Sequence, residues 1–206
     1  MDAYRALSPT TLADVLTRAN VMDFGIKPLW TGMPRVAGPA YTVRCAPGDN
    51  LMLHAAIYRA APGSIVVVQA GDLDYAVAGG NVCAVAQRRG IAAFVIDGVI
   101  RDIAEARTNA FPIFARGIIP IPGVKESLGE LGTPVLCGGV RVCAGDIIVA
   151  DEEGIIAVPS ADAKDVLARA QTRALKDAAQ NLDAWEQEHY ARIERILRDR
   201  GFRADD

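Results

Sequence analysis

The sequence has few of the residues that bind transition metals or act as covalent nucleophiles. It contains only two histidines, and its four cysteines form no Cys-x-x-Cys pair. Because a structural zinc site needs four such ligands at close spacing, the sequence argues against zinc. The same scarcity argues against a Cys/His nucleophile pair. We therefore expect all four cysteines to be reduced thiols that are buried as small hydrophobic side chains.

Long hydrophobic runs and blocks of one charge are also missing. The longest apolar runs, SIVVVQA and GIAAFVI, have the length of strands and are far too short to cross a bilayer. The formal net charge is −3, with both signs spread along 206 residues, so we expect neither a nucleic acid nor a membrane as partner. The N-terminus has no apolar signal core, and we expect a cytoplasmic protein.

The middle of the chain alternates predicted helices with apolar strands. Helices are expected over residues 8–20, 48–63, 81–90 and 102–110. Strands are expected over residues 35–47, 64–70, 91–98 and 111–117. The apolar runs lack a period of two, which is typical of strands covered on both faces in an α/β fold.

The last third of the chain changes character twice. Residues up to 159 are rich in Val, Ile and Gly and predict consecutive antiparallel strands with tight turns. From Ser160 onward the sequence predicts one or two charged amphipathic helices. We therefore expect an α/β domain over residues 1–160 and a helical extension over residues 161–206.

A glycine turn precedes the helix predicted at residues 81–90. It consists of Gly79, Gly80, Asn81 and Val82. A glycine pair before a helix leaves backbone N–H groups at the positive end of the helix dipole, where an anion is favoured. The same pair is also a common turn without a ligand, and its spacing matches neither a dinucleotide nor a P-loop fingerprint. Both interpretations stay open for this motif alone.

A basic and an acidic residue, Arg101 and Asp102, stand side by side just past the strand predicted at residues 91–98. In α/β proteins the ends of buried strands often carry ligand contacts. An aspartate there can bind a hard cation, and an arginine can hold a carboxylate through two hydrogen bonds. The alternative is a surface arginine beside a helix N-cap. Glu105, on the same helix face, could support a metal site or complete a capping box.

Taken together, these stretches resemble one known family over residues 8 to 160. Gly80, then twenty residues, then Arg101-Asp102 and Glu105, is similar to the motif of the RraA-like family. This family includes the class II 4-hydroxy-4-methyl-2-oxoglutarate / 4-carboxy-4-hydroxy-2-oxoadipate aldolases. Further similar stretches are CAPGDN, VIDGVIRD, FPIFARG and AGDIIVADEEGIIAVP. The resemblance implies an α/β/β sandwich like a phosphohistidine swivelling domain, assembled as trimers or hexamers with active sites between subunits.

The resemblance also implies roles for individual residues. Asp102 would bind a divalent Mg²⁺ or Mn²⁺ together with several waters, and Arg101 would hold the pyruvyl carboxylate of the substrate. The backbone N–H groups from Gly79 to Val82 would bind the same end. The aldolases of this family often carry an acid at the position of Gly80, and Glu105 would compensate for its absence as an outer ligand. A neighbouring subunit would add one more acid, for which the alternatives are Asp177, Glu186 and Glu188.

The implied function is that of a divalent-metal-dependent carbon–carbon lyase. It would cleave a 4-hydroxy-2-keto acid such as 4-hydroxy-4-methyl-2-oxoglutarate to pyruvate and a second keto acid through a metal-stabilised pyruvate enolate. Oxaloacetate decarboxylation passes through the same enolate, and such aldolases serve the catabolism of aromatic compounds. The alternative is a non-catalytic adaptor like the ribonuclease regulator of this family. A methyltransferase is disfavoured, because no adenosylmethionine-type glycine motif is present.

Overall fold

The computed structural model describes residues 1–202, and these residues divide into two units, the first of which is Met1–Ala170. The second unit begins at Gln171 and contains the end of one helix and all of the next. A unit of this kind is dense in internal contacts but need not fold alone. The division into a domain of residues 1–160 and an extension of residues 161–206 therefore stays a prediction.

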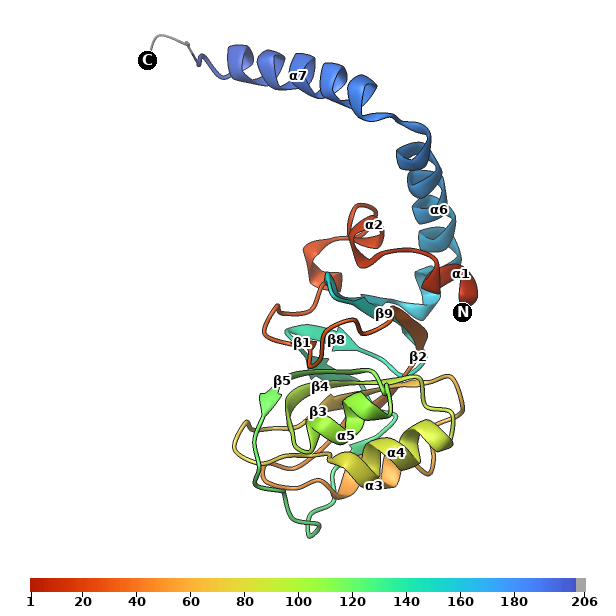
Figure 1. The fold of residues 1–206 in the computed structure, drawn as a ribbon, viewed down its shortest axis with the longest axis vertical. Helices are drawn as coiled ribbons and strands as arrows, with labels where there is room; N and C mark the ends of the chain where they lie inside the picture. The colour runs from red at the N-terminus through yellow and green to blue at the C-terminus, as the bar shows by residue number, and fades with distance from the viewer. Residues whose placement is uncertain (203–206) are drawn as a thin grey trace. The chain divides into compact units, whose positions relative to one another are not determined.

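Strands and helices alternate over residues 36–118 of the first unit, and strands without intervening helices follow up to residue 158 (Figure 1). The helices are α1 (Asp2–Arg5), α2 (Pro9–Ala13), η1 (Arg18–Asn20), α3 (Leu51–Ala56), α4 (Gly80–Arg88), α5 (Ile103–Thr108), η2 (Ser160–Asp162) and the start of α6 (Ala163–Ala179). The strands are β1 (Lys27–Pro28), β2 (Val36–Arg44), β3 (Ile65–Gln69), β4 (Ala93–Ile100), β5 (Ile113–Ile118), β6 (Glu130–Leu131), β7 (Val135–Cys137), β8 (Val140–Val142), β9 (Ile147–Asp151) and β10 (Gly154–Val158).

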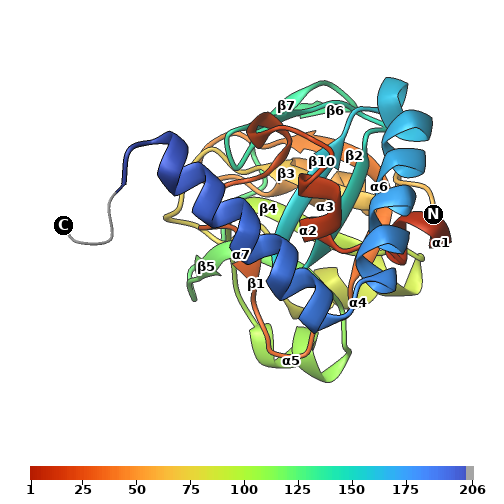
Figure 2. The ribbon, with the colours of Figure 1, turned by 90° about the horizontal axis from the view of Figure 1, so that it is seen from above.

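The centre of the first unit is a parallel sheet with the strand order β5-β4-β3-β2. Helices α3, α4 and α5 connect or follow these strands, as a parallel sheet requires. Strand β2 belongs to two pairings, because its first half pairs antiparallel with β9 and its second half pairs parallel with β3. Strands β9 and β10 extend the sheet beyond β2 (Figure 2).

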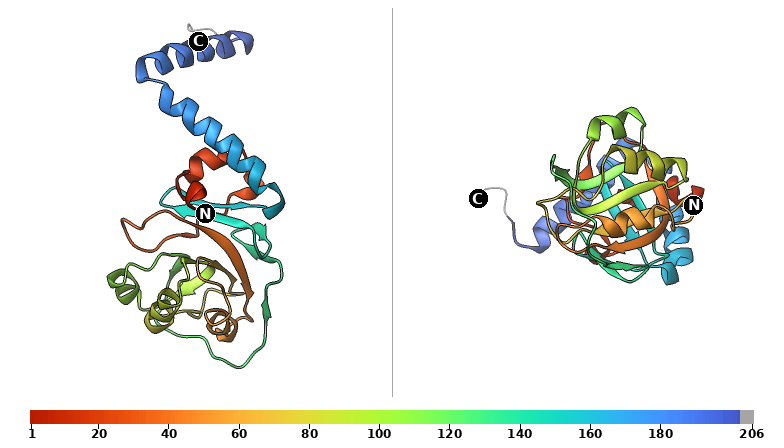
Figure 3. Two further views of the ribbon diagram at one scale, coloured as in Figure 1. Left: turned by 90° about the vertical axis from the view of Figure 1, so that its right-hand side faces the viewer. Right: turned by 90° about the horizontal axis from the view of Figure 1, so that it is seen from below.

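Two hydrophobic cores lie on opposite faces of the parallel sheet. Val66 and Val68 of β3 pack with Phe94 of β4 and with residues of α3, α4 and α5. The alternate residues Ile65 and Val67 pack with residues of β7, β8, β9 and β10. Helices α3, α4 and α5 lie together on one face of the sheet (Figure 3). The layers are thus helices, parallel sheet and a second group of strands, which confirms the predicted α/β/β fold.

Two of the predicted helices are shorter than the sequence pattern suggested. The helix expected over residues 8–20 ends at Ala13, because Asn20 Oδ1 accepts a hydrogen bond from the Thr17 amide and holds a separate 3₁₀ turn. The helix expected over residues 48–63 is regular only over Leu51–Ala56. The other strands and helices lie within a few residues of their predicted ranges.

The described part of the second unit consists of the end of α6 and of α7 (Leu182–Asp199). Asn181 begins α7, because its side chain accepts a hydrogen bond of 2.8 Å from the Ala184 amide. No residue of α7 is buried. None of the helices within residues 1–202 combines the length and the apolar character that crossing a membrane requires.

Replacing Phe94 should show that the core between the helices and the sheet carries the stability of the first unit. Phe94 is fully buried and meets Phe111 edge to face at a centroid distance of 4.9 Å. We expect Phe94→Ala to lower the free energy of unfolding by about 3–5 kcal/mol in urea titrations followed by circular dichroism. The control Phe24→Ala removes the same side chain at a position that is 92% exposed and should cost less than about 0.5 kcal/mol.

Candidate active site

The segments that follow the four parallel strands come together in one pocket. It has a volume of about 90 Å³ and is lined by Asn50, His54, Ala76, Ala78, Gly79, Asn81, Val82, Arg101, Asp102, Pro122 and Lys125. Because parallel strands end at the same edge of a sheet, residues far apart in the sequence meet there. This edge is also where open α/β sheets bind their ligands.

Backbone pairing brings the glycine turn beside Arg101 and Asp102. After β3 the chain returns along the end of β4, where the Val77 amide donates to the Val99 carbonyl at 3.0 Å. The Arg101 amide then donates to the Ala78 carbonyl, also at 3.0 Å. The predicted meeting of the two motifs is therefore present in the structure, and it arises from main-chain hydrogen bonds.

Asp102 has an unusual backbone conformation for a residue with a side chain. Its φ and ψ are 59° and 38°, in the left-handed region, which costs most side chains about 1 kcal/mol but suits aspartate and asparagine better. Asp102 precedes α5, yet its carboxylate does not cap that helix. Instead, Asp102 Oδ2 accepts a hydrogen bond of 3.2 Å from the Gly80 amide and lies 3.4 Å from Arg101 Nε. Asp102 therefore stands at the N-cap position of α5, as the alternative expected, but its carboxylate does not bond to that helix.

Glycine at positions 79 and 80 leaves room for these charged side chains. A Cβ atom on Gly79 would lie 2.6 Å from Asp102 Oδ2 and 3.1 Å from Arg101 Nε. A Cβ atom on Gly80 would overlap Glu105 Oε2. The carboxylate of Glu105 thus occupies the space that a side chain at position 80 would fill. Both glycines are explained by close approach of neighbouring side chains, because neither has a left-handed φ.

The first turn of α4 offers donors to the pocket. Gly80 is already bonded to Asp102, whereas the amides of Asn81 and Val82 have no acceptor among the described residues. Such unpaired donors are expected in the first turn of a helix. With Arg101 alongside, this turn can hold a carboxylate.

The donor set suits a cation that keeps most of its water ligands. Within residues 1–202 no group of three or more His, Cys, Asp or Glu side chains has the arrangement of a metal site. Asp102 has a side chain that is 40% exposed, and Glu105 lies one helical turn further on. One or two carboxylates with water in the remaining positions fit Mg²⁺ or Mn²⁺, whereas a closed zinc site needs more protein ligands.

Three polar residues of the pocket were not recognised as site residues from the sequence. They are Asn50, His54 and Lys125. His54 lies on the apolar helix α3, where a histidine without a motif is expected to pack or to face solvent. Asn50 ends the stretch CAPGDN, which resembles the family, but the resemblance assigned no role to it. Lys125 lies in a loop without a recognisable motif, and its position after a parallel strand is the signal that could have pointed to it.

The environment of the pocket changes the acidity of two nearby groups. Burial, assisted by the charge of Lys125, lowers the pKa of His54 to about 4. Burial, together with the nearby carboxylates of Asp102 and Glu105, raises the pKa of Cys83 to about 12. His54 is therefore a neutral ring and Cys83 a protonated thiol at neutral pH, so neither provides a charge for binding or a thiolate for catalysis.

Other charged groups of the first unit have structural partners away from the pocket. Asp97, inside β4, accepts hydrogen bonds from Arg116 Nε and from the Gly138 amide. Arg116 also binds Asp23 at 3.0 Å. These contacts explain how an acid is tolerated within a buried strand.

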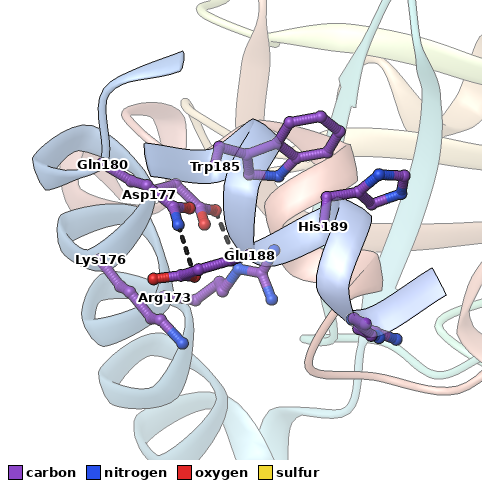
Figure 4. A pocket seen from close by; sticks show the side chains of 8 residues that line it. Arg173, Lys176, Asp177, Gln180, Trp185, Glu188 and His189 are labelled. Carbon is purple, nitrogen blue, oxygen red and sulfur yellow. Dashed lines mark hydrogen bonds and ion pairs between the residues drawn. The ribbon is translucent and has the colours of Figure 1, made fainter. Parts of the chain in front are cut away.

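The three acids suggested for the subunit contact lie in the second unit, and two have partners there. Asp177 accepts from Arg173 Nε at 2.8 Å, and Glu188 accepts from Gln180 Nε2 at 2.8 Å (Figure 4). Glu186 is exposed. Near them the rings of Trp185 and His189 stack at 4.5 Å. Which of the three acids serves a neighbouring site stays a prediction.

The fold and the pocket define a class: an α/β/β protein with a carboxylate, an arginine and a helix N-terminus at the carboxyl edge of its parallel sheet. The sequence profile of the RraA-like family, described as Aldolase/RraA, matches residues 9–157. A protein of Halalkalibacterium halodurans named "Putative 4-hydroxy-4-methyl-2-oxoglutarate aldolase" is 39% identical over 177 residues, which are 85% of this chain and 84% of that protein. The chain belongs to the RraA-like family.

Solved structures show the same fold. An uncharacterised protein of Pseudomonas syringae pv. tomato has a TM-score of 0.78 at 27% identity, covering 91% of this chain and 92% of the other. The RNA-processing inhibitor RraA from Thermus thermophilis has a TM-score of 0.67 at 29% identity, covering 74% and 92%. Relatives of this chain thus include proteins named as aldolases and one named as an inhibitor of RNA processing.

The lowered pKa of His54 predicts a loss of stability in mild acid. The unfolded chain binds a proton near pH 6.5, whereas the folded chain resists it down to about pH 4. Stability should therefore fall as the pH is lowered from 6.5 to 4. Thermal melts at several pH values should show a weaker slope for His54→Gln than for the native protein. The control His189→Gln changes the exposed histidine of α7; an equal slope in native protein and His54→Gln would contradict the assignment.

Proposed function

We propose that this protein is a divalent-metal-dependent lyase that cleaves a 4-hydroxy-2-keto acid, such as 4-hydroxy-4-methyl-2-oxoglutarate, to pyruvate and a second keto acid. The observation that carries the proposal is the conformation of Asp102. Its left-handed backbone turns the carboxylate away from its own helix and toward Arg101 and the first turn of α4. Strained backbone of this kind is concentrated at functional sites. The aldolase names of the relatives point to the same chemistry.

The residues of the pocket suit the pyruvyl half of such a substrate. Arg101 and the amides of Asn81 and Val82 can bind the carboxylate next to the keto group. Asp102 would hold Mg²⁺ or Mn²⁺ beside that keto group. The bound cation would supply positive charge where negative charge develops on the keto oxygen.

The same arrangement serves two reactions. In retro-aldol cleavage the 4-hydroxyl loses its proton, the bond between C3 and C4 breaks, and the electron pair moves onto the pyruvyl fragment. In oxaloacetate decarboxylation the bond to the C4 carboxylate breaks, carbon dioxide leaves, and the same electron pair remains. Both end when C3 accepts a proton to form pyruvate. The negative charge on the pyruvyl fragment is stabilised in both cases by groups aimed at its oxygens.

Glu105 would do what an acid at position 80 does in related aldolases, which is to bind water ligands of the cation. Its carboxylate fills the space above Gly80, and the Gly80 amide donates to Asp102. From there the carboxylate of Glu105 can accept hydrogen bonds from water ligands of the cation. Outer contacts of this kind orient the ligands of a metal and strengthen its binding. The proposal extends to a trimer or hexamer, in which a neighbouring subunit adds a further acid.

A non-catalytic adaptor is the alternative function. The name of the Thermus relative as an RNA-processing inhibitor favours it. An adaptor has no need of a strained aspartate beside an arginine in a pocket, which is why the lyase is preferred. If the folded protein with Mg²⁺ or Mn²⁺ turns over neither oxaloacetate nor 4-hydroxy-4-methyl-2-oxoglutarate, the adaptor becomes the better interpretation.

Replacing the carboxylate of Asp102 by an amide tests the lyase directly. Asparagine tolerates the left-handed conformation, so Asp102→Asn should keep its Tm within about 3 °C of the native value. Because the amide carries no charge for a cation, we expect kcat/KM for pyruvate release to fall about 100-fold or more. A coupled pyruvate assay with added Mg²⁺ measures this, and a chelator should abolish the native activity.

The control for this experiment is Asp74→Asn, which changes an exposed loop acid outside the pocket. It should leave kcat/KM and chelator sensitivity unchanged. Native-like turnover by Asp102→Asn, or turnover that survives the chelator, would rule out the proposed mechanism.

The role of Glu105 can be tested by moving its carboxylate to position 80. Glu105→Ala should weaken Mn²⁺ binding about 10-fold or more, measured by calorimetry or by the electron paramagnetic resonance signal of free Mn²⁺. The double variant Gly80→Asp/Glu105→Ala should recover most of this loss, because the new carboxylate enters the space that Glu105 vacates. Glu153→Gln, in the turn between β9 and β10, is the control. Unchanged affinity in Glu105→Ala would exclude the role.

A further inference from the structure

The pocket contains a second positively charged side chain, Lys125, to which the proposed binding of the pyruvyl end gives no role. Arg101 follows β4, whereas Lys125 comes from the loop after β5, and both line the same small pocket. Lys125 forms no ion pair with any residue in the described part of the chain. An anion between or beside two such cations would relieve their repulsion.

The loop that carries Lys125 is held in place on both sides of this residue. The buried carboxylate of Asp49 accepts hydrogen bonds from the Glu126 and Ser127 amides at 2.6 and 2.7 Å. Before Lys125, the Val124 amide donates to the Gly48 carbonyl at 2.9 Å. Burial alone would raise the pKa of Asp49, but these backbone hydrogen bonds outweigh it and lower the pKa. Asp49 is therefore a stable anchor that fixes the backbone of Lys125 at the pocket.

Two further polar side chains stand beside Lys125 in the pocket wall. His54 is neutral and can donate one ring N–H group. Asn50 is 3% exposed and donates from Nδ2 to the Gly123 carbonyl at 2.9 Å, which again fixes the loop. Its Oδ1 accepts no hydrogen bond from any described residue. A buried acceptor without a donor is unfavourable, so this wall favours a ligand that brings a hydroxyl as well as an anion.

We propose that Lys125 and His54 bind the second carboxylate of a dicarboxylic 4-hydroxy-2-keto acid, and so select substrates with two acidic ends. This inference rests on the proposed function for the assignment of Arg101 to the first carboxylate. With both ends held by loops that are fixed to the sheet, the bond between C3 and C4 lies between two anchored points. In the cleavage of 4-hydroxy-4-methyl-2-oxoglutarate the second carboxylate stays on the departing keto acid and keeps its charge throughout.

Oxaloacetate behaves differently at such a subsite. Its second carboxylate is the group that leaves as carbon dioxide and must lose its charge. An ion pair with Lys125 would stabilise the starting state rather than the transition state. The subsite therefore favours aldol cleavage over decarboxylation.

Two unreactive acids test the subsite by binding alone. 2-Oxoglutarate and 2-oxopentanoate have the same five-carbon 2-keto chain and differ in whether the far end is a carboxylate or a methyl group. Calorimetry with and without Mg²⁺ should show that the native protein binds 2-oxoglutarate about 10-fold more tightly or better. Lys125→Met should remove this preference, and His54→Leu should reduce it. Lys27→Met, an exposed lysine of β1, is the matched control and should keep it.

Turnover separates this inference from the proposed function. Lys125→Met should lower kcat/KM for 4-hydroxy-4-methyl-2-oxoglutarate about 10-fold or more, and should lower kcat/KM for oxaloacetate decarboxylation by a smaller factor. Equal binding of the two acids, or a preference that survives Lys125→Met, overturns the subsite. If the protein cleaves 4-hydroxy-4-methyl-2-oxoglutarate but does not prefer 2-oxoglutarate over 2-oxopentanoate, the lyase proposal stands and the subsite is wrong. If it prefers 2-oxoglutarate but cleaves no substrate, the subsite stands and the lyase proposal is wrong.

Discussion

The main-chain pairing between the end of β4 and the segment after β3 is the constraint on which the site depends. The hydrogen bonds from Val77 to Val99 and from Arg101 to Ala78 bring two glycines against an arginine and an aspartate. A Cβ atom on Gly79 would approach the side chains of Asp102 and Arg101, and one on Gly80 would overlap the carboxylate of Glu105. The charged side chains then fill the space that side chains at these positions would have taken. Backbone geometry, rather than attraction between charges, therefore sets the positions of Arg101 and Asp102.

The rest of the pocket is built in the same way, by polar anchors on neighbouring loops. The side chains of Asp49 and Asn50 hold the loop of Lys125 by hydrogen bonds to its backbone amides and to the Gly123 carbonyl. The result is a small pocket with two cations, one carboxylate at its rim and a helix N-terminus. Rigid placement of this kind lets a site distinguish the two ends of a small molecule, because each group is fixed before binding.

Local patterns in the sequence predict much of this fold. The apolar runs Ile65–Val68 of β3 and Ala93–Ile96 of β4 lack polar residues, and the structure buries them on both faces between two cores. The helix of residues 8–20 was predicted too long because a side chain of Asn20 competes with helical hydrogen bonds. Such competition depends on a few local contacts that hydrophobic periodicity does not record.

The sequence by itself determined the alternation of helices and buried strands and the two motifs at Gly79 and Arg101, because both depend on neighbouring residues. Only the tertiary structure decided that Glu105 lies above Gly80 and that Asn50, His54 and Lys125 share the pocket. These residues are separated by up to 75 positions along the chain from Asn50 to Lys125 (125 minus 50). They meet because four parallel strands end at one edge of the sheet, and that register is set by packing across the whole domain.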